Sequence, residues 1–99
     1  MRLTIEQTEA IRQTTAEIFD ATTPIWLFGS RVDDSKRGGD VDLLVVPRAL
    51  NAEQALQAKI RFLNKLAKRI GERKVDLIIE MPNDTRPIVQ IAHQTGVLL

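Results

Sequence analysis

The sequence contains no cysteine, which excludes disulfide bonds, thiolate zinc sites and a thiol nucleophile. An excess of either charge is also missing, because 14 basic and 13 acidic residues leave a formal net charge of +1. Direct nucleic-acid binding is therefore not expected from the overall charge. No apolar run approaches the length of a membrane span, and the first residues turn polar at once, so no signal peptide is expected. These absences favour a cytoplasmic protein without a membrane role.

Length and composition are those of an ordinary globular domain. The chain has 99 residues, of which 43% are hydrophobic and 27% charged. It shows no internal repeat, linker or low-complexity segment. We therefore expect residues 1–99 to form a single domain.

Apolar periodicity and capping signals predict three helices and three strands. The helices are expected over residues 5–20 after a capping box at Thr4 and Gln7, from the N-cap Asn51 to Gly71, and from near Asp84 to Gly96. The strands are expected over residues 25–29, 41–46 and 74–80, with a loop over 30–39. A short link joins the first two strands and a helical crossover joins the second to the third, which favours a mixed sheet. The predicted fold class is α/β (α+β), a small mixed β-sheet flanked by helices.

Two apolar groups extend this prediction. The stripe of the long helix is expected to face the core, and its members are Leu56, Ile60, Leu63, Ala67 and Ile70. The C-terminal part of the chain is rich in apolar residues for so small a domain: Ile88, Ile91, Ala92, Val97, Leu98 and Leu99. Part of this C-terminal group is expected to face a partner.

Gly29-Ser30 and, after nine intervening residues, Asp40-Val41-Asp42 form the most informative motif. Side chains two apart on a strand point to the same face, so Asp40 and Asp42 should lie together at the start of an apolar strand. Such carboxylates are costly to desolvate without a compensating cation, and Mg²⁺ takes one or two carboxylates plus substrate phosphates. Gly29 lets a ligand approach the backbone, and Ser30 offers a hydroxyl to a phosphate. The motif predicts a metal–nucleotide site.

A third acid, Asp76, lies within another apolar strand. Three carboxylates on adjacent strands are able to hold two metal ions that bridge an attacking oxygen and a leaving phosphate. Simpler readings remain open: Asp76 as a structural acid paired with Lys74 or Arg73, and Asp40 as a loop residue. Ser30 as the cap of a helical turn is compatible with phosphate binding.

Phe28-Gly29-Ser30-Arg31, the spaced Asp40-Val41-Asp42-Leu43 and Asp76 together resemble the minimal nucleotidyltransferases (MNT) of the DNA polymerase β superfamily, of the MntA-like antitoxin type. The resemblance implies transfer of AMP from ATP to an acceptor hydroxyl, with Mg²⁺ or Mn²⁺ as cofactor. It implies that the metal and catalytic residues are Asp40, Asp42 and Asp76, and that the nucleotide is held by Gly29, Ser30 and Arg31.

Residues 32–34 depart from the family pattern, because many relatives continue with Ala-Arg-Gly where this chain has Val-Asp-Asp. Positive charge near the phosphates would then come from Lys36 or Arg37 instead. The resemblance also implies a helical HEPN-type partner, with the chain as antitoxin to a toxin, or a second copy that completes the pocket. Two alternatives stay open: a non-catalytic nucleotide-binding module that acts by contact, and a nucleotidyltransferase for a small molecule such as an aminoglycoside.

Basic residues gather from Lys59 onward along the long helix and just after it. They are interpreted as the solvated face of an amphipathic helix, with a docking patch for an acidic partner as the alternative. His93 and Trp26 are interpreted as structural.

Overall fold

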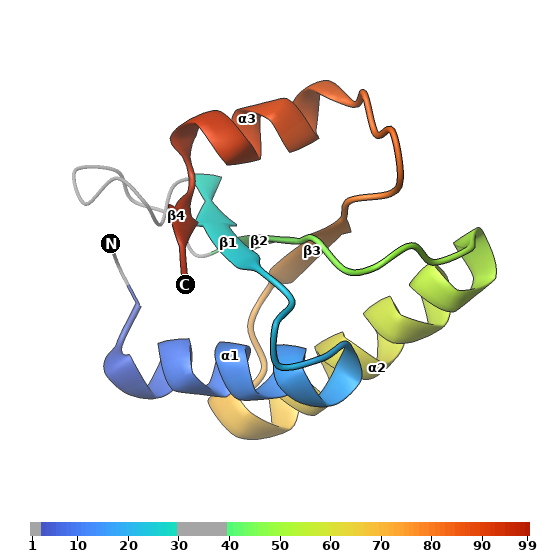
Figure 1. Cartoon of the computed structure of the whole chain (residues 1–99). Coiled ribbons are helices and arrows are strands. Elements are labelled where there is room, and N and C mark those ends of the chain that lie inside the picture. The colour runs from blue at the N-terminus through green and yellow to red at the C-terminus, as the bar shows by residue number, and fades with distance from the viewer. Residues whose placement is uncertain (1–2, 30–39) are drawn as a thin grey trace.

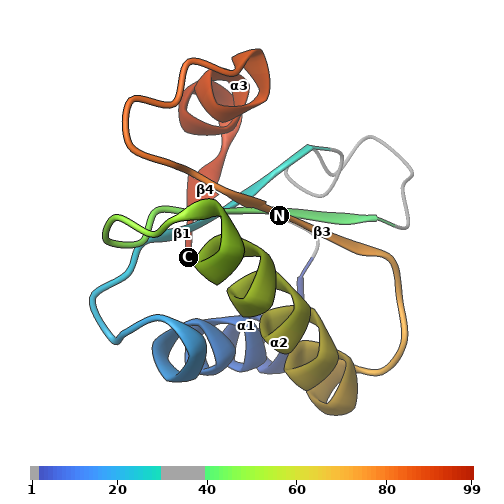
Figure 2. The ribbon, with the colours of Figure 1, turned by 90° about the vertical axis from the view of Figure 1, so that its right-hand side faces the viewer.

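A four-stranded sheet lies between helices in the computed structural model, which describes residues 3–29 and 40–99. The elements in chain order are α1 (Ile5–Ile18), β1 (Ile25–Phe28), β2 (Val41–Val45), α2 (Ala52–Ile70), β3 (Val75–Ile79), α3 (Pro87–Thr95) and β4 (Val97–Leu98). Figures 1 and 2 place α1 and α2 together below the sheet and α3 above it. The predicted mixed sheet flanked by helices is therefore confirmed. Within the described ranges, no helix combines the length and the apolar character needed to cross a membrane.

The strand order is β3-β2-β1-β4, with β2 parallel to β3 and the other pairs antiparallel. The sequence prediction missed β4, which pairs Leu98 with Trp26 and Val97 with Leu27. The sequence places Val97 and Leu98 in the C-terminal apolar group and predicts no strand there. A strand of only two residues is too short to give a period-two pattern, and its pairing with β1 comes from the fold.

The core has two parts because side chains alternate between the faces of the sheet. The larger cluster lies between the sheet and helices α1 and α2, and its fully buried members include Ile11, Leu27, Leu43, Phe62 and Leu77. The smaller cluster lies under α3 and consists of Phe28, Leu44, Val89 and Ala92, with Trp26, Val46 and Ile78 packed against it. Burial of each large apolar side chain contributes roughly 1.5–3 kcal/mol, so the larger cluster dominates stability.

The predicted helix caps agree with the structure. Thr4 and Asn51 each accept a hydrogen bond from the backbone N–H three residues on, and the side chains of Gln7 and Gln54 return the bond to complete two capping boxes. Gly71 ends α2 with a φ of +83°, which glycine adopts without strain. Local signals therefore set the ends of both long helices.

The predicted core face of α2 was wrong in its first half. Leu56 and Ile60 are 60% and 52% exposed, whereas Phe62 and Leu66 are buried. At about 100° per residue, side chains six positions apart on an α-helix point in directions that differ by about 120°. Leu56 and Phe62 therefore cannot face the same core. The aromatic ring of Phe62 packs beside Phe19 and occupies the core position.

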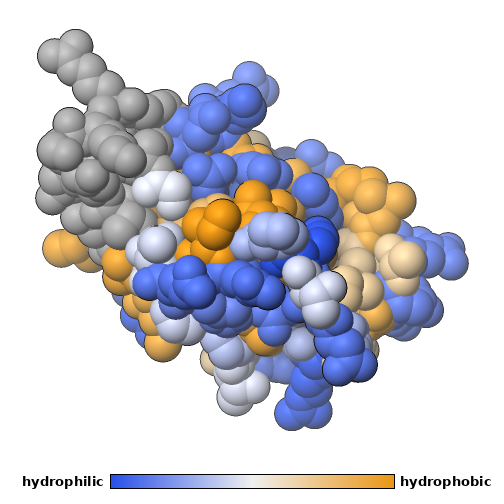
Figure 3. Space-filling model, turned by 90° about the horizontal axis from the view of Figure 1, so that it is seen from above, coloured by the Kyte–Doolittle hydropathy of each residue, from blue (hydrophilic) through white to orange (hydrophobic). Residues whose placement is uncertain are grey.

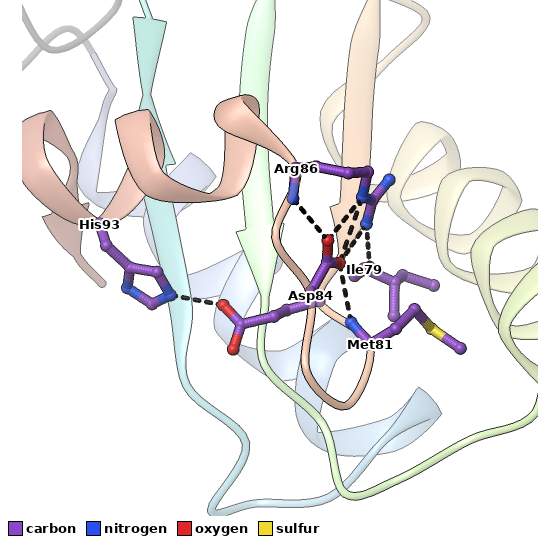
Figure 4. Close-up of polar contacts among 6 residues, drawn as sticks. Ile79, Met81, Asp84, Arg86 and His93 are labelled. Atoms are coloured by element: carbon purple, nitrogen blue, oxygen red, sulfur yellow. Dashed lines mark hydrogen bonds and ion pairs between the residues drawn. The ribbon is translucent and has the colours of Figure 1, made fainter.

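The last helix begins at Pro87 and not near Asp84 as predicted. Asp84 instead accepts hydrogen bonds from the backbone N–H groups of Met81 and Arg86, which closes a turn (Figure 4). The Arg86 guanidinium binds the Asp84 carboxylate and also donates to the carbonyl of Ile79 at 2.8 Å. This turn fixes the direction in which the chain leaves β3 and enters α3.

Candidate active site

The three acids of the sequence motif lie near the beginnings of β2 and β3. Asp42 on β2 and Asp76 on β3 are direct partners in the parallel register. Their side chains share the face of the sheet that carries Leu44 and Ile78, which is the face beneath α3. Asp40 immediately precedes β2. The fold therefore brings together residues that are up to 36 positions apart in the sequence.

The electrostatics of Asp42 reflect this arrangement. Its pKa is raised above the ordinary value, first by burial and then by the negative charges of Asp76 and Asp40. Lys74 opposes the rise but does not cancel it. The Asp42 carboxylate is therefore held at an electrostatic cost when it is ionised.

Two lysines approach the outer two acids. The Lys74 Nζ lies 3.5 Å from Asp40 Oδ2, and the Lys59 Nζ lies 4.0 Å from Asp76 Oδ1. The alternative pairing of Asp76 with Lys74 or Arg73 is thus replaced by a contact with Lys59, which comes from α2. All four side chains are substantially exposed, so these ion pairs are weak and easily exchanged for another cation.

Gly29 joins the two halves of the motif. It follows β1 with a φ of +79°, and a methyl group at its Cα would collide with Oδ2 of Asp42. Register explains the contact, because Phe28 is the β1 partner of Asp42. The glycine is therefore required both by its backbone conformation and by the space that the Asp42 carboxylate occupies. Ser30, Arg31, Lys36 and Arg37 lie outside the described residues.

Within the described part of the chain, the acid cluster offers hard oxygen donors to a metal ion but not a complete protein cage. Among residues 3–29 and 40–99, no three carboxylate, imidazole or thiolate side chains converge as a ready-made metal cage. The cluster nevertheless supplies only hard oxygen ligands, and its mutual repulsion is what a divalent cation would offset. Mg²⁺ commonly takes one or two protein carboxylates and completes its shell with water and phosphate. The residues present therefore fit a metal that is bound together with a nucleotide.

Lys59 is the site contact that the sequence interpretation missed. It had been counted with the solvated charges of the long helix, and no local pattern separates it from the other lysines there. Its contact with Asp76 depends on how α2 packs against β3, which spacing along the chain does not reveal.

The structural interpretation of His93 and Trp26 agrees with their contacts. The His93 Nε2 lies 2.5 Å from Glu80 Oε1, and its ring meets that of Trp26 edge-on at 5.3 Å (Figure 4 shows the contact with Glu80). These contacts tie α3 to β1 and to the segment that follows β3. They hold α3 over the sheet face that carries the acids.

Comparison with known families gives one match. The profile of the nucleotidyltransferase domain family matches residues 9–98, which include Gly29 and all three acids. No curated protein matches the chain significantly. The matched region covers most of the sequence and every strand of the sheet. The chain belongs to the nucleotidyltransferase domain family.

Proposed function

We propose that the protein is a Mg²⁺-dependent nucleotidyltransferase that moves AMP from ATP to a hydroxyl of a partner protein, with a HEPN-type helical toxin as the acceptor. Family membership supports nucleotidyl transfer in general. The observation that carries the proposal is the cluster of Asp40, Asp42 and Asp76, in which Asp42 is destabilised by its neighbours and touches Gly29.

The reaction forms a bond between the acceptor oxygen and the α-phosphorus of ATP. The bond from that phosphorus to the bridging oxygen breaks, and pyrophosphate leaves with the bonding electrons. The acceptor loses its hydroxyl proton to Asp76 or, through it, to solvent. Catalysis of this kind depends mainly on positioning and on charge neutralisation, since no covalent enzyme intermediate is needed.

Each acid has a separate role in this proposal. Asp40 and Asp42 hold the metal that accompanies the triphosphate, and Asp76 holds the acceptor-side metal. Bound Mg²⁺ supplies neutralisation of the phosphate charge and lowers the pKa of the acceptor hydroxyl. Gly29 leaves room for the Asp42 carboxylate at the end of β1, and Ser30 and Arg31 bind the phosphates. Lys59 and Lys74 occupy the same carboxylates weakly in the absence of metal.

A protein acceptor is supported by exposed apolar side chains on α3 and β4. Ile88 and Ile91 of α3 are 38% and 51% exposed, and Leu98 of β4 is 56% exposed. Seen from the α3 side in Figure 3, hydrophobic patches interrupt a mainly hydrophilic surface. Such patches favour association with a partner or with a second copy.

The test is transfer to the purified HEPN partner. With ATP and Mg²⁺, intact-mass spectrometry should show the partner gaining one or more adenylyl units, and EDTA should abolish the gain. Asp76→Asn should slow transfer more than it weakens ATP binding measured by calorimetry. Transfer that persists in EDTA, or that is unchanged by Asp40→Asn with Asp42→Asn, would refute the enzymatic proposal.

A non-catalytic role is the second candidate, because Lys59 and Lys74 already neutralise two of the acids without metal. In that case the double variant Asp40→Asn with Asp42→Asn would still neutralise the toxic activity of an unmodified partner fully. Retained neutralisation by the double variant would favour the binding module over the enzyme.

A further inference from the structure

The order of strands gives the candidate site two sides. Gly29 at the end of β1, Asp42 on β2 and Asp76 on β3 follow one another across the sheet. Under the proposed function, the phosphates bind beside Gly29 and the acceptor hydroxyl reacts near Asp76. Within the described residues β3 is an edge strand, with β2 as its only neighbour in the sheet. The acceptor side of the site is therefore the open edge of the sheet.

The backbone of β3 leaves hydrogen-bonding groups at this edge. Two backbone hydrogen bonds join the ends of β3 to β2. The Val41 N–H donates to the Lys74 carbonyl, and the Glu80 N–H donates to the Val45 carbonyl. By alternation, the N–H and carbonyl groups of Val75, Leu77 and Ile79 point away from β2. The hydrogen bond from Arg86 to the Ile79 carbonyl supports this direction, because Arg86 lies outside the sheet.

A groove of about 260 Å³ follows the same edge, between β3 and α2. Its lining is mainly apolar and includes Leu56, Leu77, Ile78 and Met81. Lys59, also in the lining, touches Asp76 and so joins the groove to the acid cluster. Leu56 is 60% exposed and lies in the first half of α2, where Ile60 is exposed as well.

We propose that this groove, called here the β3-edge groove, binds an extended segment of the acceptor protein as an added strand. The inference rests on the proposed function for the identity of the acceptor. An extended segment fits because outward N–H and carbonyl groups recur at Val75 and Leu77, two residues apart, a spacing that a strand matches. The Ile79 carbonyl is already bound by Arg86, so the added strand would pair with the first part of β3. Apolar side chains of that segment would then contact Leu56 and Met81.

Strand addition would also deliver the hydroxyl. Side chains that lie opposite one another on paired strands have Cβ atoms roughly 4.5–5.5 Å apart. A serine, threonine or tyrosine opposite Asp76 would therefore project on the face of the acids and next to the acceptor-side carboxylate. The substrate class is thus a hydroxyl residue within an extended segment, not one in the middle of a rigid helix.

Charge favours an acidic segment. Lys59 lies at the groove and is cationic, whereas the Arg86 guanidinium at the same groove is already bound to Asp84. The contact of Lys59 with Asp76 is 4.0 Å long and half exposed, so Lys59 is able to move to a carboxylate of the incoming segment when Asp76 takes a metal. Basic side chains at an edge strand also discourage pairing with unsuitable segments.

Two substitutions test the groove. Leu56→Glu places a charge in the β3-edge groove, while Ile5→Glu makes the same change at an 80% exposed position outside the groove lining. Binding to the helical partner used in the transfer experiment is measured by calorimetry, with Mg²⁺-dependent ATP binding as a check on folding. Leu56→Glu should raise the Kd for the partner at least tenfold, and Ile5→Glu less than twofold.

Amide hydrogen exchange tests the added strand itself. The outward N–H of Leu77 should exchange rapidly in the free protein and become protected in the complex, whereas the inward N–H of Ile78 should be protected in both. Equal partner affinity in the two glutamate variants, an unprotected Leu77 in the complex, or no partner binding at all would overturn the inference. Partner binding with Leu77 protected but without AMP transfer would instead refute the proposed function and leave the docking inference standing.

Discussion

Two aspartates on the same side of the sheet have opposite electrostatic surroundings. Asp84, whose side chain is only 5% exposed, accepts hydrogen bonds from the Arg86 guanidinium and from two backbone N–H groups, and its pKa lies far below the ordinary value. Asp42 faces Asp40 and Asp76 instead, and its pKa is raised. The protein neutralises the first carboxylate with its own groups and leaves the second without full compensation.

The difference separates an acid that serves the fold from one that suits a ligand. Arg86 and the turn around Asp84 gain stability from each other, because every lone pair of the carboxylate has a donor near it. Asp42 is only partly compensated by Lys74, and full compensation of its charge requires a further positive charge from outside. Perturbed carboxylates of the second kind gather at functional sites, and substitutions at the two positions should therefore have opposite consequences.

The largest effect is expected on transfer. Asp42→Asn should lower the rate of AMP transfer about a thousandfold, which corresponds to about 4 kcal/mol of transition-state stabilisation, because the metal and triphosphate lose a ligand. Asp84→Asn, assayed well below its unfolding temperature, should retain activity within about threefold. Single-turnover assays with saturating ATP measure both. Similar losses of transfer rate in the two variants would show that Asp42 and Asp84 do not differ in their importance for the reaction.

The reverse ranking is expected for stability. Asp84→Asn should lower the free energy of unfolding by about 2 kcal/mol, because a half-exposed guanidinium and two backbone N–H groups lose a charged acceptor. The Tm should fall by about 10 °C. Glu9→Gln, which breaks only the exposed pair with Arg12, is the matched control and should change stability by less than about 0.5 kcal/mol.

The Asp84 effect should also depend on pH. Its folded pKa is lowered from the ordinary value of 3.8, so its stabilisation is complete above that value and is lost as the pH falls below it. Denaturant melts of the wild type and Asp84→Asn should therefore converge in acid. If the difference in free energy of unfolding between the two proteins stays constant from pH 7 to pH 2, the charge of the Asp84 carboxylate contributes nothing to stability.

Metal binding should stabilise the wild type by a smaller amount. At a Mg²⁺ or Mn²⁺ concentration ten times the Kd, linkage gives about 1.4 kcal/mol. The shift in Tm should survive in Asp84→Asn and disappear in Asp42→Asn. It should also weaken as the pH falls through the raised pKa of Asp42, because the protonated carboxyl does not bind the cation. An equal shift in Asp42→Asn would place the metal elsewhere.

Local patterns predicted most of the fold. The capping box at Thr4, the N-cap at Asn51 and the C-terminal glycine at position 71 depend on neighbours within four residues, and the structure has all three. The strands beginning near Ile25, Val41 and Val75 were visible as apolar runs. The acids were found because charged side chains are unexpected in such runs. Their common face then follows from the parallel register of β2 and β3, which the helical crossover favoured.

The remainder depended on tertiary packing. Asp84 was read as a helix start, but its carboxylate is occupied by Arg86 and the turn at Met81, so the helix begins at Pro87. Lys59 reaches Asp76 only because α2 lies against the edge of β3. Contacts between residues so distant in sequence leave no periodic signal.

The smallest effect is a gain in stability at the candidate site. Asp42→Asn should raise the Tm of the metal-free protein by about 2 °C at pH 7, since it removes repulsion with Asp40 and Asp76 and solvent screening keeps the gain below ~1 kcal/mol. The folded pKa of Asp42 is above its ordinary value of 3.8, so the cost exists only where the carboxyl is ionised. The advantage of Asp42→Asn should therefore be full at neutral pH and vanish as the pH falls below 3.8. Asp76→Asn is the control with a smaller gain, because it also loses the contact with Lys59. Calorimetric scans in EDTA that show Asp42→Asn less stable than the wild type at pH 7 would mean that the carboxylate supports the fold and is not reserved for a ligand.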